Sequence, residues 1–396
     1  MNNDIRRPTT RVVTMPPEAK ATPPPLLMAD NSDNKPSKSK FKQLKHWLNE
    51  RVSRKKLIIG GVVFVLLLAG GIAFGLTHQA AAPQPNIVAT KPKPKPVVYT
   101  SRLTGVVVTQ AQSVLPVTGV MIENSDAARP QSGLMEAGVV FEAIAEGGVT
   151  RFLALYEEGQ PDSIGPIRSA RPYYVHWLLP FDAAYAHVGG SPDGLSAVQA
   201  LNVKDMNQFY NGSYYTRITS RYAPHNVYSS MAKLLSLEQS KGWTTSNFTG
   251  FLRKADSPSK SPTATSIDLN ISGPDFNPHY DYVASSNSYA RSEGGAKHID
   301  AVSGAPLSPK VVIAMVVPWT NGVLDATGAY YTNYSDIGSG AAYIFQDGIV
   351  TIGTWNKASI QSQLAFTDSS GKPIKLNAGQ TWISAVGAAA GVVYKQ

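Results

Sequence analysis

Cysteine is absent from this chain, and its absence excludes several kinds of chemistry at once. Without a thiol, the protein forms no disulfide, carries no lipid on a cysteine, offers no thiol nucleophile and holds no cysteine-ligated zinc. The sequence also has no H-x-x-x-H pair and no serine in a G-x-S-x-G turn. Because these spacings are typical of helical zinc sites and of serine hydrolases, we expect neither, and we expect no metal and no cofactor.

The larger part of the chain also lacks an excess of charge. The formal net charge is +9, but residues 1–56 hold 13 Lys/Arg and 5 Asp/Glu, which leaves 23 against 22 for all the residues that follow. A basic segment beside an apolar one is what the positive-inside bias of membrane proteins produces. The positive charge therefore indicates a membrane and not a nucleic acid, which we do not expect as a partner.

Four segments precede the folded region. Residues 1–40 are rich in proline and small polar residues, which predicts a disordered cytoplasmic tail. In 41–56 apolar residues recur at helical spacing among Lys and Arg, which predicts a basic amphipathic juxtamembrane helix on anionic lipid, or else a solvated lead-in to the next helix. The uninterrupted apolar run 57–76 is long enough to cross a bilayer core of about 30 Å as a transmembrane helix. Residues 77–101, with K-P-K-P-K-P, predict a semi-rigid spacer.

The position of the apolar run indicates a retained signal anchor. It is longer than the roughly 7–15 apolar residues of a secretory signal, and it begins more than fifty residues into the chain. Lys and Arg gather on its N-terminal side. We therefore expect a single-pass protein of the plasma membrane, with the N-terminus cytoplasmic and the C-terminal domains extracytoplasmic.

Two domains of different class are predicted beyond the spacer. In 102–245 apolar runs of strand length alternate with helical segments, which predicts an α/β domain. After a linker at 246–264, rich in Ser, Thr, Lys and Pro, short alternating strands and Gly-rich turns predict a mostly antiparallel β domain over 265–396. The predicted strands are 114–122, 139–143, 149–156, 183–188, 281–289, 311–318, 329–334, 342–345, 350–355 and 380–385, and the predicted helices are 133–137, 171–179, 193–201 and 229–241.

A run of charged residues in apolar surroundings is the main candidate site. The candidates are Arg129, Glu142, Glu146, Arg151, Arg168 and Arg171. Such charges need partners, and two interpretations stay open. Either the glutamates pair with the arginines and hold the loops of the sheet, or some arginines stay unpaired in a cleft and bind an anionic wall component, such as a muropeptide or a teichoic-acid-like polymer.

The two glutamates also allow a hydrolase hypothesis. Glu142 and Glu146 could act as general acid and base, which needs a separation of about 5–9 Å. In a regular strand, residues four apart lie roughly 13 Å from each other, so an irregular backbone would be required. His187, which precedes Gly189-Gly190 at a predicted strand end, is a binding-site candidate together with Asp193. His225 and Asn226, which lie in a loop, are further ligand-binding candidates.

Aromatic residues of the second domain have two interpretations. Trp319, Trp355 and Trp382, with the tyrosines of 330–334, could form a face that stacks on sugars, or they could be core. We expect Trp355 and Trp382 in the core and leave the tyrosines open.

Several ordered phrases resemble the YerB-like family. In the first domain these are M-I-E-N-S-D-A-A-R-P-Q-S-G-L (121–134), F-E-A-I-A-E-G-G-V-T-R-F-L-A (141–154), I-G-P-I-R-S-A-R-P-Y (164–173), A-H-V-G-G-S-P (186–192) and A-P-H-N-V-Y (223–228), and in the second G-S-G-A-A-Y-I-F-Q-D-G (338–348), G-T-W-N-K (353–357) and I-K-L-N-A-G-Q-T-W-I (374–383). The resemblance implies an extracytoplasmic two-domain protein of Gram-positive type and supplies no catalytic residues. Many relatives resemble lipoproteins with a modified cysteine, which the transmembrane helix would replace here.

Together these observations predict a membrane-anchored protein of the cell envelope. We expect it to bind an anionic wall polymer or peptidoglycan through an Arg/Glu-rich cleft in the α/β domain. The alternatives are a carboxylate-dependent wall hydrolase and a non-catalytic partner of wall-synthesis enzymes.

Overall fold

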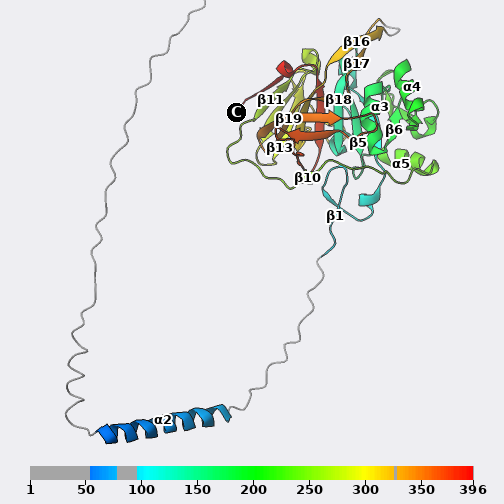
Figure 1. Ribbon diagram of the computed structural model, residues 1–396. Helices are drawn as coiled ribbons and strands as arrows, with labels where there is room; N and C mark the ends of the chain where they lie inside the picture. Colours follow the sequence, from blue (N-terminus) through cyan, green and yellow to red (C-terminus); the bar gives the residue numbers. More distant parts are fainter. Residues whose placement is uncertain (1–53, 78–95, 325–327, 396) are drawn as a thin grey trace, which may run out of the picture. The chain divides into compact units, whose positions relative to one another are not determined.

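The computed structural model describes residues 54–77, 96–324 and 328–395. The predicted tail, nearly all of the juxtamembrane helix and most of the spacer lie outside the described residues. The chain divides into two compact units, Met1–Lys93 and Pro94–Gln396, which are described separately (Figure 1).

Helix α2, Arg54–Thr77, is the described part of the first unit and contains the whole apolar run 57–76. Side chains are described for its residues 59–70, and all of these are exposed within the unit. In the part of the chain that the structure describes, no helix is both long and apolar enough to cross a membrane. The membrane-spanning role of 57–76 therefore stays a prediction.

The first half of the second unit has the predicted alternation of strands and helices. The β4–β5 pair is nearly continuous apolar sequence buried on both faces, and it turns at Gly147 and Gly148, which have φ of 56° and 81°. The elements are β1 Tyr99–Thr100, β2 Val107–Val108, β3 Thr118–Glu123, β4 Val139–Glu146, β5 Val149–Tyr156, α3 Pro172–Leu178, β6 Ala184–His187, α4 Pro192–Ala200, β7 Lys204–Asn207, β8 Thr216–Arg217, β9 Val227–Tyr228 and α5 Met231–Ser240. The predicted helix at 133–137 is a single 3-10 turn, Leu134–Glu136.

The helices begin where the local sequence provides caps. Ser191 Oγ accepts a hydrogen bond from Gly194 N at the start of α4, and Ser230 does the same for Lys233 N at α5. Helix α3 starts with Pro172 at its first turn, directly after Arg171. These signals explain why the helix positions were predictable.

The second half is built from strands, as predicted. They are β10 Arg253–Lys254, β11 Ser266–Leu269, β12 Pro278–Val283, β13 Ser288–Glu293, β14 Ala296–Lys297, β15 Val311–Val316, β16 Trp319–Leu324, β17 Tyr330–Tyr334, β18 Gly338–Gln346, β19 Ile349–Lys357, β20 Ala365–Asp368, β21 Leu376–Asn377, β22 Thr381–Val386 and β23 Val392–Lys395. The predicted Asp347-Gly348 turn joins β18 to β19 with φ of 59° and 75°. The single strand predicted over 281–289 is wrong, because Asn287, at φ 48°, turns the chain between β12 and β13.

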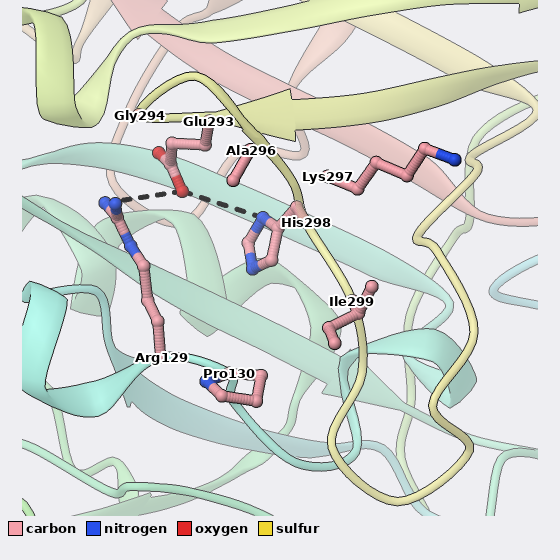
Figure 2. Close-up of a pocket in the computed structure, with 8 residues that line it drawn as sticks. All are labelled: Arg129, Pro130, Glu293, Gly294, Ala296, Lys297, His298 and Ile299. Carbon is pink, nitrogen blue, oxygen red and sulfur yellow. Dashed lines mark ion pairs between the residues drawn. The ribbon is translucent and has the colours of Figure 1, made fainter.

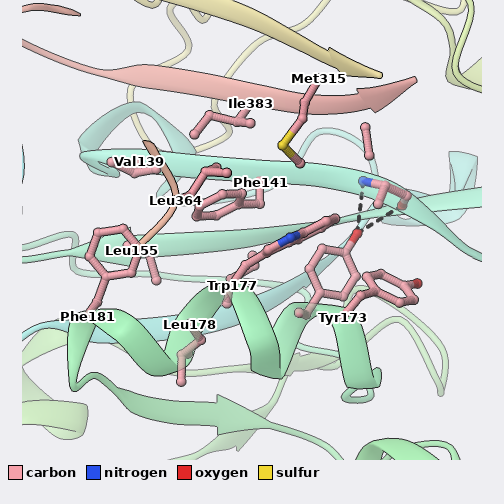
Figure 3. Packing of buried hydrophobic residues seen from close by; sticks show 14 of the residues in the cluster. Val139, Phe141, Leu155, Tyr173, Trp177, Leu178, Phe181, Met315, Leu364 and Ile383 are labelled. Carbon is pink, nitrogen blue, oxygen red and sulfur yellow. Dashed lines mark hydrogen bonds between the residues drawn. The ribbon is translucent and has the colours of Figure 1, made fainter. Parts of the chain in front are cut away.

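One large sheet crosses both predicted domains. Its order is β20-β19-β18-β15-β22-β4-β5-β3-β6-β7, with the β16–β17 hairpin attached to β4, and β22 pairs in parallel with β4. The core beneath it is shared as well: Phe141 and Trp177 pack in the same cluster as Met315 and Ile383 (Figure 3). A second, antiparallel sheet has the order β14-β13-β12-β11-β23. The two halves therefore form one compact unit and share a core cluster.

Strand direction decides which residues meet. Strands β3, β6 and β7 are mutually parallel, and β5 runs antiparallel to both β3 and β4. The carboxyl ends of β3, β4, β6 and β7 therefore lie at one edge of the sheet, together with the beginning of β5. In sheets of this kind, ligands usually bind at that edge.

Candidate functional site

Five charged residues gather at this edge, and we call them the strand-end cluster: Glu123, Glu146, Arg151, Arg168 and Arg171. Glu123 ends β3 and Glu146 ends β4, while Arg151 is the register partner of Glu123 on β5. The two remaining arginines lie in the loop between β5 and α3. Four of the five are among the predicted site residues, whereas Glu123 was missed.

Glu146 holds two of the three arginines of the cluster. One carboxylate oxygen pairs with Arg151 Nη2 and the other with Arg171 Nη2. Arg151 also donates to the Ser169 carbonyl at 2.9 Å, and Arg171 to the Ala170 carbonyl at 2.6 Å. Both guanidiniums are almost fully buried, and burial, together with the charge of Arg171, lowers the pKa of Arg151 to about 10. For these two arginines, the interpretation as internal pairs is correct.

Arg168 is held more loosely. Its Nε lies 3.4 Å from Glu123 Oε2, which is an ion pair but not a hydrogen bond, and its guanidinium makes no hydrogen bond with a described residue. The other oxygen of Glu123 is occupied by Ser125 Oγ and His225 Nδ1, each at 2.8 Å. The side chains of Arg168 and His225 are 22% and 27% exposed, so solvent reaches both.

The strand-end cluster has one more guanidinium than it has carboxylates. Three guanidiniums face two carboxylates, and both carboxylates are already paired. Of the three guanidiniums, Arg168 is the one that makes no hydrogen bond with a described residue and the one that water reaches most. A guanidinium with free donors in a half-buried position is suited to the oxygens of a carboxylate or a phosphate.

Glu142 does not belong to this cluster. It is fully buried and accepts two hydrogen bonds from Arg291, at 2.7 and 3.1 Å, and one from Ser384 at 2.9 Å. The register of β4 against β5 shifts between Ile144 and Glu146. The irregular backbone that the hydrolase hypothesis required is therefore present. It nevertheless leaves the two carboxylates bound to different arginines and does not join them in one site.

Arg129 lines a separate hollow of about 290 Å³ together with Pro130, Glu293, Gly294, Ala296, Lys297, His298 and Ile299 (Figure 2). Its guanidinium is paired with Asp126 at 3.2 Å and lies 3.5 Å from Glu293 Oε2. It also donates to the Asp275 carbonyl at 2.7 Å. Because these partners occupy its donors, Arg129 is not the open cation that the sequence allowed.

Comparison with known proteins agrees with this architecture. Residues 103–244 match the N-terminal domain, and residues 267–383 the C-terminal domain, of a family described as "Protein of unknown function (DUF3048)". The chain belongs to the DUF3048 family. The chain is 28% identical to a Bacillus subtilis protein named "Putative lipoprotein YerB" over 288 residues, which are 72% of this chain and 85% of that protein. The crystal structure of YerB from Bacillus subtilis superposes with a TM-score of 0.66 at 26% identity, covering 75% of this chain and 99% of that one. The predicted YerB-like resemblance is confirmed.

In this DUF3048 protein His187 has a different partner from the one predicted. Its Nε2 lies 3.0 Å from Asp205 Oδ1 on β7, and its Nδ1 lies 2.7 Å from the Gly189 carbonyl. The ring is fully buried, whereas Asp193 is exposed in the first turn of α4. Asn226 accepts a hydrogen bond from Arg217 at 2.9 Å. Of the predicted residues His187, Asp193, His225 and Asn226, only His225 contacts the strand-end cluster.

Metal-binding geometry is not found in the described part of this DUF3048 chain. There, no three His, Asp or Glu side chains are placed to hold a metal ion.

Sequence reasoning missed two residues that organise the charges of the DUF3048 fold. Arg291 is fully buried, with its guanidinium 4.3 Å from the centre of the Trp382 ring, and Glu123 connects Arg168 to His225. The available signal was weak. Glu123 directly follows a buried apolar strand, and Arg291 and Glu293 alternate with small residues in a strand-like segment.

Proposed function

We propose that this protein is anchored to the membrane, faces the outside of the cell and binds an anionic component of the envelope at Arg168. The observation that carries the binding proposal is the excess of one guanidinium in the strand-end cluster. Burial disfavours an uncompensated charge, so an anionic group that contacts Arg168 and His225 would complete the site.

The compartment is supported by three observations. The Bacillus subtilis relative is named a lipoprotein, and this chain has no cysteine to carry a lipid. It has instead an apolar run of 20 residues with basic residues before it, and the apolar side chains from Ile59 to Leu68 are 49–71% exposed in α2. Burial of these side chains in a bilayer would remove that exposed surface from water. Residues 57–76 are the proposed anchor.

The hydrolase alternative has less support. A general acid must reach the bond that it cleaves, but Glu142 has no exposed surface and Glu146 is shared between two arginines. The same residues serve well as a rigid frame for Arg168. We therefore propose binding without catalysis.

The direct test is binding of residues 94–396 to two probes, poly(glycerol phosphate) for phosphate and a muropeptide for carboxylate. Loss of one charge-assisted contact costs about 1.5–3 kcal/mol, so Arg168→Gln is expected to weaken binding of the true ligand class roughly ten- to a hundredfold. The affinity should also fall as salt is raised.

The matched control is Lys372→Gln, which removes the same charge from an exposed turn after β20, at the other end of the large sheet from β7. It should leave the affinity unchanged. Equal losses in the two variants would mean a diffuse charge effect, and no binding of either probe by the parent protein would refute the proposal.

A further inference from the structure

An exposed tryptophan marks a second region of interest. Trp355 and Trp382 are buried in the core, as predicted, but Trp319 at the start of β16 is 38% exposed. Strands β16 and β17 form a hairpin that projects from the body of the second unit (Figure 1). A large aromatic side chain in water is often part of a binding surface.

Trp319 lies where two hollows meet. The two hollows, of about 460 and 570 Å³, both include Ile271 and Trp319 in their walls. We call the combined depression the Trp319 groove. Its remaining lining residues are Ile144, Gly147, Gly148, Ser272, Asn321, Tyr330 and Thr332 on one side of Trp319, and Asn270, Pro318, Gly387, Ala388, Ala390 and Gly391 on the other.

The lining of the groove has a definite chemistry. It contains no Asp, Glu, Lys, Arg or His, although charged clusters lie close by. Two aromatic rings are combined with side-chain amides, hydroxyls and glycine backbone. Binding sites for small neutral ligands are typically built in this way, from apolar and aromatic walls with a few polar groups.

Gly387 allows Trp319 to take its position. A Cβ atom at residue 387 would lie 2.7 Å from Trp319 Nε1, closer than real Cβ atoms approach. The indole therefore rests directly on the backbone, and its remaining surface is left to the groove. Tyr330, on the neighbouring strand, is 47% exposed and adds a second ring.

Strand alternation separates the groove from the strand-end cluster. Tyr330 and Thr332 line the groove, whereas Tyr331 between them lies under Arg171, with the guanidinium 4.9 Å from the ring centre. One strand thus presents uncharged groups to the groove and an aromatic face to the cluster. A ligand of the groove need not be charged.

We propose that the Trp319 groove binds a neutral stretch of polysaccharide. The apolar C–H face of a pyranose ring would stack on Trp319 and Tyr330. Its hydroxyls would find the exposed Asn321 amide, the Ser272 oxygen, whose own proton is donated to the Gly148 carbonyl, and the backbone of the glycines. Two hollows that share Ile271 and Trp319 in their walls offer places for two neighbouring sugar rings of a linear chain.

The test is titration of the full-length protein in detergent with soluble β-1,4-linked N-acetylglucosamine oligomers, followed by calorimetry and by tryptophan fluorescence. Trp319→Ala is expected to weaken binding at least about tenfold, and Tyr330→Ala by a smaller factor. Trp319→Phe should retain part of the affinity, because a ring is still present. Affinity should increase with oligomer length until the groove is filled.

Controls separate the groove from folding and from the anionic site. Tyr222→Ala removes an aromatic ring that is 91% exposed outside the groove, and it should have no effect. If Trp319→Ala is poorly folded by circular dichroism, Asn321→Ala serves as the second variant and should also weaken binding. Arg168→Gln should leave oligomer binding intact, so failure of one proposal does not imply failure of the other.

Two results would overturn the inference. One is an affinity for the oligomers that is the same in the parent, Trp319→Ala and Asn321→Ala proteins. The other is that the oligomers do not bind, whereas an extended uncharged peptide protects Trp319 fluorescence from a quencher. The groove would then be a peptide site.

Discussion

Strand β4 contributes one glutamate to each of two charge clusters, Glu142 to one and Glu146 to the strand-end cluster. The two clusters differ in how completely their charges are matched. Around Glu142, the guanidiniums of Arg129 and Arg291 equal in number the buried carboxylates of Glu142 and Glu293, and Arg129 also pairs with the exposed Asp126. At the strand-end cluster, three guanidiniums face two carboxylates. The first cluster is centred on fully buried groups, whereas the second reaches solvent at Arg168. The comparison shows that the cluster with more guanidiniums than carboxylates is the one that reaches solvent, which agrees with the cost of burying a lone ion.

The largest effect on stability is expected from removing Arg291 from the cluster around Glu142. Arg291→Met leaves Glu142 buried without its cation and should lower the free energy of unfolding by about 3–5 kcal/mol. Chemical denaturation of residues 94–396 measures this. The double variant Arg291→Met/Glu142→Met should recover much of the loss. A single variant as stable as the parent would show that the pair is not buried as described.

Glu238 shows what happens to a buried carboxyl that has no guanidinium beside it, in contrast to Glu142. Glu238 forms no ion pair with a described residue; it accepts a hydrogen bond from Thr118 at 2.6 Å, and burial raises its pKa from 4.5 to about 7. Since the folded state binds this proton more tightly, Glu238 contributes stability below pH 4.5 that is lost as pH rises to about 7. The loss is on the order of 2–3 kcal/mol.

Glu238→Gln is the check on this pH dependence. The amide cannot ionise, so unfolding free energies measured between pH 4.5 and 7.5 should decline less steeply in the variant than in the parent. Identical slopes would contradict the raised pKa.

Removing the Glu146 carboxylate from the strand-end cluster should have a smaller effect on stability. Glu146→Gln leaves Arg151 and Arg171 without a carboxylate, and we expect a loss of about 1–3 kcal/mol in unfolding free energy. The loss is smaller than at Arg291 because the Glu146 side chain is 18% exposed and water can partly solvate the arginines. Thermal denaturation compared with Glu136→Gln, a carboxylate without an ion pair to a described residue, gives the measurement and its control.

The smallest effect on stability is expected at the site proposed for the ligand. Arg168→Gln removes a long ion pair of 3.4 Å, and Glu123 keeps its contacts with Ser125 and His225, so the free energy of unfolding should change by less than about 1 kcal/mol. If this variant proved as unstable as Glu146→Gln, then Arg168 would be a structural partner of Glu123 and the contrast between the clusters would disappear.

Much of the local structure was predictable because its signals lie within a few residues. The strand 149–156 was placed at its observed bounds, helices α3, α4 and α5 were placed to within two residues at each end, and the Asp347-Gly348 turn was identified from its positive-φ residues. The predicted strand over 281–289 failed because Asn287 is a weaker turn signal than glycine.

The candidate site was predictable only in part. Glu146, Arg151, Arg168, Arg171 and His225 do meet at the strand ends, but Glu142 and Arg129 belong to other surroundings, and His187 pairs with Asp205. Glu142 and Arg129 take a partner from β13, which is distant in sequence, whereas Asp205 lies on β7, the strand that follows β6. Glu142, for example, is neutralised from β13, a strand of the other predicted domain.

The sequence by itself determined the positions of most strands and helices, the family resemblance and the absence of cysteine chemistry, because each depends on residue identity or on spacing along a short stretch. Only the tertiary structure decided that β22 joins β4 in one sheet and that Arg168, of all the arginines in the strand-end cluster, keeps free donors. The physical reason is that a buried charge takes its partner from whatever packs against it, and what packs against β4 comes from segments up to about two hundred and forty residues away.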